Sequence, residues 1–302
     1  MARFGSVVTA MVTPFDDEGG LDLDGAVALA RHLSASGSDG LVLAGTTGEG
    51  PVLTDGERLD LFRSVADAVT VPVVAATGTN DTAHTVRLTR EASACGVDGV
   101  LVVTPYYNRP SAAGLEAHFR AAAAATGLPV LLYDIPVRTG RRIGTELLLR
   151  LAADVPNLVG VKDATGDVAG AAEVVAGTPE GFEVYAGDDS TTLPFLAIGA
   201  AGIVSVASHW AGGTFAELTG AFADGDLDRA RRANARLFES YRFEASDRYP
   251  NPVPAKAACR ALGLPGGDCR LPHPPAPGSL VDEARGVIGR LEDAASTAAG
   301  TP

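Results

Sequence analysis

Short apolar runs alternate along this chain with longer stretches in which apolar residues recur every three or four positions. The runs are rich in Val, Leu and Ile, which is typical of parallel strands buried on both faces. The longer stretches have the spacing of amphipathic helices. The eight predicted strands are Val7–Val12, Gly40–Ala44, Val71–Ala76, Gly99–Thr104, Pro129–Tyr133, Leu158–Lys162, Glu183–Ala186 and Gly202–Val206. The intervening helices are predicted at residues 22–36, 54–69, 81–95, 111–126, 144–153, 167–177, 189–199 and 209–223.

The order of these elements predicts an α/β fold, a (β/α)8 TIM barrel. Parallel neighbours need a crossover connection, and eight strand–helix units in roughly 225 residues match the count and size of this barrel. A doubly wound open sheet is the alternative, and it would ordinarily carry a G-x-G-x-x-G turn after its first strand. Residues 13–16 cannot form that turn, and the glycine-rich residues 45–50 lack the spacing and the lysine of a phosphate-binding loop.

The strand pattern ends near residue 224. We therefore expect residues 1–224 to form the barrel and residues 225–302 to form a C-terminal helical extension that packs on it. Helices are predicted in the extension at residues 226–245, 253–262 and 279–294, with a Pro-rich connector at Leu271–Gly278.

Composition narrows the classes of function. Hydrophobic residues make up 46% of the chain and charged residues 20%, which suits a folded core. The net charge of −13 argues against binding to nucleic acid or to anionic membrane surfaces. The 3 cysteines and 5 histidines lack the spacings of disulfide frameworks and zinc sites, so no metal is expected. No apolar run approaches the ~20 residues that span a bilayer, and the first residues do not form a signal peptide, so a cytoplasmic protein is predicted.

Lys162 is unusual because lysine is almost absent from the chain. Of the 24 Lys and Arg residues, only Lys162 and Lys256 are lysines. Lys162 ends the apolar run that begins at Leu158, where partial desolvation would free its amine to attack a carbonyl, which an arginine cannot do. A Schiff-base lysine is one interpretation. The other is a lysine left by chance and paired with Asp163.

Lys256 lies in an Ala-rich stretch of the extension, Pro254–Leu262, that is predicted to be helical. A solvated lysine on a helix surface is the expectation there.

Polar residues gather after the predicted strands, where the active site of a TIM barrel lies. These segments are Gly45–Glu49, Thr77–Asn80, Thr104–Asn108, Tyr133–Arg138, Lys162–Asp163 and Gly187–Asp189. A lysine, phenols, hydroxyls and an arginine meet there, without the residues of a metal site. The chemistry indicated is amine catalysis on a carbonyl, with a phenol moving protons and an arginine holding a carboxylate.

Each of these residues also has a structural interpretation. The tyrosines could be packing aromatics, and Thr46 and Thr47 could be turn residues. Asp188 and Asp189 could cap the next helix, and Arg141 and Arg142 are expected to be surface charges.

Several segments together resemble the dihydrodipicolinate synthase family. They are Gly45–Glu49, Thr104–Pro110, Tyr133–Gly140, Val161–Ala164 and Gly187–Asp189, and the resemblance runs from Gly5 to about the last helix. It implies a TIM barrel and an aldolase-type condensation. Pyruvate would form an imine on Lys162, and its enamine would attack aspartate semialdehyde on the route to diaminopimelate and lysine. No cofactor beyond this covalent imine is implied.

The resemblance also implies roles for individual residues. Tyr133 would donate and accept protons, with Thr46 and Tyr107 completing a hydroxyl relay. Tyr107 would reach the site of a neighbouring subunit, since the family commonly forms homotetramers built from tight dimers. The substrate-binding residues would be Thr47, the backbone at Val204, Gly187 and, for the carboxylate of the semialdehyde, Arg138.

Two other functions share the main features. N-acetylneuraminate lyase and keto-sugar-acid aldolases have the same barrel, lysine and tyrosine. Arg138, the Thr46–Thr47 pair and Tyr107 suit a short aldehyde with a carboxylate better than a sugar chain. A non-catalytic barrel that senses a keto acid is the third possibility, and the intact set of Lys162, Tyr133 and Thr46 argues against it.

The chain departs from the family where members inhibited by lysine bind the inhibitor. The matching positions look like Asp55 or Arg58, and His84, where a glutamate would be usual. We expect feedback inhibition by lysine to be weak or absent, because a histidine and an arginine would repel a cationic ligand. Asn80, Glu49 and Tyr106 remain as groups that could hold lysine in another pose.

Overall fold

The computed structural model describes residues 2–299, and their strands form one closed barrel. Each strand pairs in parallel with the strands before and after it, and β8 pairs with β1. The strands are β1 (Val7–Ala10), β2 (Gly40–Leu43), β3 (Val73–Ala76), β4 (Gly99–Val103), β5 (Val130–Asp134), β6 (Leu158–Asp163), β7 (Glu183–Ala186) and β8 (Gly202–Ser205). The predicted TIM barrel is confirmed, and the predicted strand ends are within about two residues of those observed.

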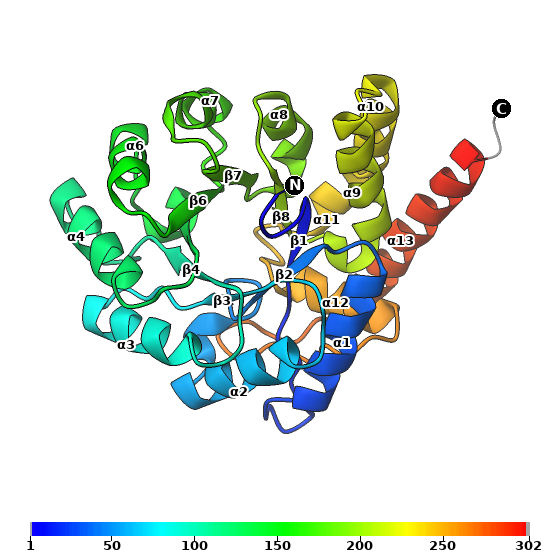
Figure 1. The fold of residues 1–302 in the computed structure, drawn as a ribbon. Coiled ribbons are helices and arrows are strands. Elements are labelled where there is room, and N and C mark those ends of the chain that lie inside the picture. Colours follow the sequence, from blue (N-terminus) through cyan, green and yellow to red (C-terminus); the bar gives the residue numbers. More distant parts are fainter. Residues whose placement is uncertain (1, 300–302) are drawn as a thin grey trace.

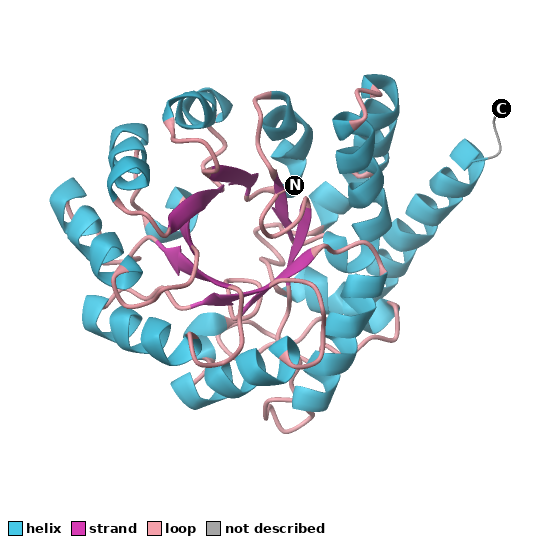
Figure 2. Ribbon diagram, viewed as in Figure 1, coloured by secondary structure: helices cyan, strands magenta, loops and turns pink. Residues whose placement is uncertain are grey.

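Helices surround the barrel as an outer layer (Figures 1 and 2). They are α1 (Leu23–Ala35), α2 (Asp55–Ala66), α3 (Thr82–Ala92), α4 (Ala112–Ala123), α5 (Pro136–Thr139), α6 (Thr145–Asp154), α7 (Val168–Gly177), α8 (Thr192–Ala197) and α9 (Ser208–Ala223). Short 3-10 turns, η1 (Gly50–Val52) and η2 (Asp189–Thr191), precede α2 and α8. The helix starts follow local chemistry. Thr54, for example, accepts from the amide of Glu57, whose carboxylate accepts from the Thr54 amide, a capping box.

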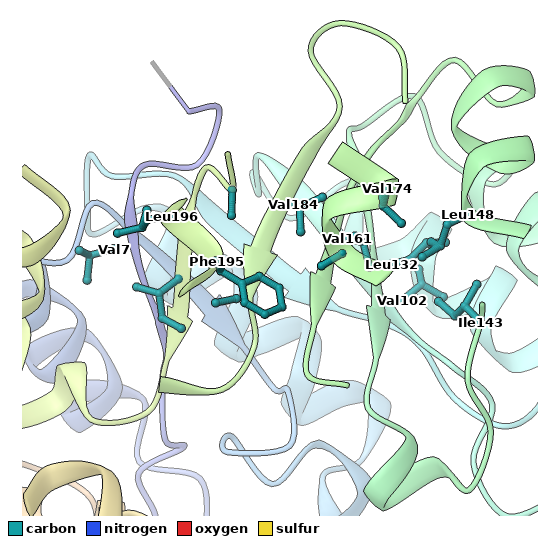
Figure 3. Close-up of a cluster of buried hydrophobic side chains, with 14 of the residues drawn as sticks. Val7, Val102, Leu132, Ile143, Leu148, Val161, Val174, Val184, Phe195 and Leu196 are labelled. Atoms are coloured by element: carbon teal, nitrogen blue, oxygen red, sulfur yellow. The ribbon is translucent and has the colours of Figure 1, made fainter. Parts of the chain in front are cut away.

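The side chains of the strands divide between two layers of core. One set fills the barrel, including Val8, Leu101, Leu131 and Val204. The other set points outward and packs under the helices, as Figure 3 shows for Val102 and Leu132 beside Leu148 of α6. Because both faces are apolar, the strands lack the alternation of half-exposed sheets, which explains the continuous runs in the sequence.

Within residues 2–299 four helices follow the barrel, and Figure 1 shows them on one side of it, near α9. They are α10 (Leu227–Arg236), α11 (Phe238–Phe243), α12 (Val253–Ala261) and α13 (Gly278–Ala299). An apolar cluster that includes Val253, Ala257, Leu280 and Ala284 joins α12 to α13. The prediction of one helix at 226–245 is wrong, because the chain forms two helices there, α10 and α11. At the boundary the Leu237 amide donates to the Asn234 carbonyl, three residues back.

None of the helices within residues 2–299 is both long enough and apolar enough to span a membrane. The same residues contain no group of three or more His, Cys, Asp or Glu that could hold a metal ion.

Candidate active site

Lys162 lies inside the barrel at the carboxyl end of β6. It pairs in register with Tyr133 on β5, and both side chains are only 5% exposed. The Lys162 Nζ lies 4.4 Å from the centroid of the Tyr133 ring. The sequence left open an ion pair with Asp163, but the Asp163 carboxylate accepts from the Thr165 amide at 2.8 Å. Within residues 2–299 Lys162 has no carboxylate in ion-pair contact, so its amine is held against an aromatic ring instead.

A pocket of about 280 Å³ opens at this end of the barrel. Its wall includes Thr46 after β2, Tyr133 on β5 and Arg138 on α5, three residues that the sequence had singled out. Leu101 and Ala76 supply the apolar floor. The pocket therefore joins hydroxyl groups and a cation to an apolar surface. Lys162 itself does not line it, but the Tyr133 ring in the pocket wall is the ring that the Lys162 amine contacts. Other polar residues of the wall are Glu49, Arg58, Tyr106, Thr139 and His273.

Thr47 is buried next to the pocket wall and points toward the helical extension. Its Oγ1 accepts a hydrogen bond from the Asn251 side-chain amide at 2.9 Å. Arg138, an exposed residue within the short helix α5, donates from Nη2 to the Asn251 carbonyl at 3.4 Å. One residue of the extension thus contacts two of the predicted substrate-binding residues.

Gly187 and Val204 lie at the ends of β7 and β8. Gly187 donates to the Asp163 carbonyl at 2.7 Å, and a Cβ there would lie 2.9 Å from the Cβ of Ala164. Only glycine allows these two backbone segments, at the ends of β6 and β7, to approach this closely. Val204 is buried in the same interior cluster as Tyr133.

Tyr107 points away from the pocket, and 91% of its surface is exposed. Its φ is +70°, a left-handed conformation that is unfavourable for a residue with a Cβ. The three other non-glycine residues of positive φ among residues 2–299 are Ala44, Glu49 and Arg109, which also follow β2 or β4. Backbone strain therefore gathers in the loops that carry the candidate residues.

The prediction for Lys256 is wrong. Its side chain is 1% exposed, and its Nζ lies 2.7 Å from the Glu49 carboxylate. Burial lowers the pKa of Lys256, while the pairing with Glu49 opposes this. The helical spacing around Lys256 predicted α12 correctly, but it carried no information on which face of α12 would meet the barrel.

The residues expected to match the lysine-binding positions of the family are already paired. His84 Nε2 lies 2.8 Å from Asp55, and the Arg58 guanidinium donates to the Gly50 carbonyl. Glu49, which the sequence left available for lysine, is held by Lys256. Weak inhibition by lysine stays a prediction, which a steady-state assay with millimolar lysine checks.

Asp134 is a buried acid directly after Tyr133 on β5. One of its carboxylate oxygens accepts from the Ile143 amide at 3.0 Å, and the other has no hydrogen-bond partner within the described part of the chain. Burial raises the pKa of Asp134 from 3.8 to about 6, partly opposed by the bond from Ile143. The charged form of this side chain is therefore unfavourable in the folded protein.

Comparison with known proteins gives consistent matches over nearly the whole chain. The family model described as the dihydrodipicolinate synthetase family matches residues 3–287. The 4-hydroxy-tetrahydrodipicolinate synthase of Moorella thermoacetica is 51% identical over 272 residues, which are 89% of this chain and 92% of that protein.

Solved structures agree with this match. A dihydrodipicolinate synthase from Cyanidioschyzon merolae with lysine bound has a TM-score of 0.93 and 40% identity, covering 97% of this chain and 99% of that one. A chloride-inhibited dihydrodipicolinate synthase from Acinetobacter baumannii, complexed with pyruvate, has a TM-score of 0.89 and 32% identity, covering 96% and 99%.

Asp134 generates a prediction on pH dependence. Its folded pKa of about 6 lies above the ordinary 3.8, so its contribution to stability is present below pH 4 and is lost as the pH rises to about 6. The shift corresponds to about 3 kcal/mol. Unfolding free energies of wild type and Asp134→Asn, measured in urea between pH 4 and 7, should diverge by about this amount in favour of the variant. Parallel curves would contradict the assignment.

Proposed function

The chain belongs to the dihydrodipicolinate synthetase family, and we propose that it condenses pyruvate with aspartate semialdehyde to give 4-hydroxy-tetrahydrodipicolinate. It is a Schiff-base-forming lyase of diaminopimelate and lysine biosynthesis. The observation that carries the proposed chemistry is the buried amine of Lys162 against Tyr133, beside a pocket with Thr46 and Arg138 in its wall.

In the first step the Lys162 amine attacks the keto carbon of pyruvate. Loss of water gives an imine, and loss of a proton from the pyruvate methyl group gives an enamine whose carbon attacks the aldehyde. The cationic imine nitrogen serves as the electron sink, so we propose that no cofactor is needed beyond this covalent intermediate. Tyr133, with its ring beside the amine, is our candidate for moving the protons, with Thr46 and Tyr107 continuing the relay.

We assign the carboxylates of pyruvate and of the semialdehyde to different residues at the carboxyl ends of the strands. Thr47 and the backbone at Val204 would hold pyruvate close to Lys162, and Gly187 would leave room beside them. Arg138 would bind the carboxylate of the semialdehyde, because a guanidinium forms two parallel hydrogen bonds to a carboxylate.

A related aldolase of sugar acids is not favoured. The curated relatives that match this chain at 45–51% identity carry the synthase name. The pocket also has the guanidinium of Arg138 in its wall, which suits a substrate with a carboxylate.

We also propose that the enzyme is a cytoplasmic homotetramer in which Tyr107 enters the site of a neighbouring subunit. The support is the 91% exposure of this large side chain and its unfavourable backbone conformation. Sedimentation measures the assembly. A monomer with full activity would contradict the proposed role of Tyr107.

Lys162 should form a reducible imine with pyruvate. Incubation with pyruvate and borohydride, followed by peptide mapping by mass spectrometry, should add the mass of the reduced adduct to the peptide containing Lys162. Lys162→Arg should be inactive although it keeps the charge, because a guanidinium does not become a nucleophile at neutral pH. A label on Lys256, or none, would sink the mechanism.

Arg138→Ala should impair the second substrate more than the first. Loss of a charge-assisted carboxylate pair costs about 2–4 kcal/mol, so kcat/KM for the semialdehyde should fall by roughly 30- to 1,000-fold. Trapping of pyruvate on Lys162 should largely survive. The role would be refuted by a variant that loses trapping but keeps its affinity for the semialdehyde.

A further inference from the structure

We infer that Lys256 and Glu49 form a positioning pair through which the helical extension holds the Thr46–Thr47 turn in its reactive geometry. This inference rests on the proposed function, because it assigns the pair to the turn that would bind pyruvate. It makes the extension a working part of the active site and not only a support for the barrel.

The pair is deeply buried. Both side chains are 1% exposed, and Lys256 Nζ lies 2.7 Å from Glu49 Oε1. The same Nζ donates to the Asp268 carbonyl at 2.8 Å and lies 4.2 Å from the centroid of the Phe15 ring. Lys256 is therefore fixed by three contacts, and it does not line the pocket.

Glu49 transmits this position directly to the turn. Its amide donates to the Thr46 carbonyl at 3.1 Å, and the next amide, of Gly50, donates to the Gly45 carbonyl at 3.0 Å. Thr46, Thr47 and Glu49 therefore belong to one closed turn after β2. Glu49 itself has a φ of +54°, so this turn is strained, and the anchored carboxylate opposes its relaxation.

The second oxygen of Glu49 is also bound by the extension. Glu49 Oε2 accepts from the Arg270 amide at 2.8 Å, and the Arg270 guanidinium reaches Glu57 on α2 and the Val52 carbonyl. Independently, Asn251 donates to Thr47 at 2.9 Å. The extension thus contacts the turn at two positions, Thr47 and Glu49.

A buried ion pair is weak support for stability, because desolvation of two charges offsets most of their attraction. Replacing both partners by neutral groups is often neutral for stability, whereas removing one leaves an unpaired buried charge. Stability and positioning can therefore be separated by comparing single and double variants.

The experiment compares wild type, Lys256→Met, Glu49→Gln with Lys256→Met, and Arg236→Met. Arg236 pairs with Glu217 between α10 and α9, so its variant loses a partly buried ion pair without touching the turn. The measurements are Tm, the rate of borohydride trapping with pyruvate, and KM for pyruvate, all taken well below each Tm. Lys256→Met also leaves Lys162 as the one lysine in the sequence, so the trapped peptide is unambiguous.

We expect Lys256→Met to lower Tm, to slow trapping and to raise KM for pyruvate by about 10- to 100-fold, the effect of a displacement of roughly 1 Å. The double variant should regain Tm while trapping stays slow, because Gln and Met form no hydrogen bond to each other. Arg236→Met should have a lower Tm than wild type, with the rate of trapping and KM for pyruvate unchanged. If Lys256→Met does not fold, the double variant gives the same comparison.

Trapping and KM at wild-type values in the folded double variant would overturn the inference, since the pair would then act on stability alone. The same holds if Arg236→Met slows trapping as much as Lys256→Met does. Failure of the proposed function is distinguishable, because wild type itself would then not be trapped by pyruvate.

Discussion

Closure of eight parallel strands is the constraint on which this site depends. In a closed parallel barrel every strand delivers its carboxyl end to the same rim, so residues far apart in the sequence meet there. The register between β5 and β6 sets Tyr133 beside Lys162. Because neighbouring strand positions point to opposite sides, the same register turns Asp163 away and leaves the amine without a carboxylate partner.

The barrel alone does not complete the rim. The turn after β2 carries Thr46 and Thr47 in a strained backbone, and residues of the extension hold it through Glu49 and Thr47. Arg138, on the exposed turn after β5, meets the same segment at Asn251. The helices that follow the barrel therefore shape the loops most directly involved in the proposed chemistry.

The positively charged side chains divide between buried lysines and mostly exposed arginines. Both lysines of this acidic chain are buried, one against a tyrosine ring and one against a glutamate, while arginines form the surface ion pairs. The two environments give the same residue type different roles. An amine without a carboxylate partner can act as a nucleophile, whereas an amine held by three contacts can only fix its neighbours.

Local pattern was sufficient for much of this protein. The apolar runs predicted all eight strands, because a strand buried on both faces has a continuous apolar sequence. Lys162 was recognisable because lysine is rare in the chain and this one ends a buried strand. Predictions failed where they depended on which distant segment packs against a helix. For Lys256 the helix was predicted correctly, but the face of the helix that is buried was not.

The sequence by itself determined the order of strands and helices, the barrel, and the residues gathered at its rim. The tertiary structure decided which distant residues touch them. Asn251 and Thr47 are 204 positions apart, and Arg270 and Glu49 are 221 apart. Hydrophobic periodicity reports burial along one element, whereas these contacts depend on how the extension docks on the barrel, and that docking is set by packing among many residues at once.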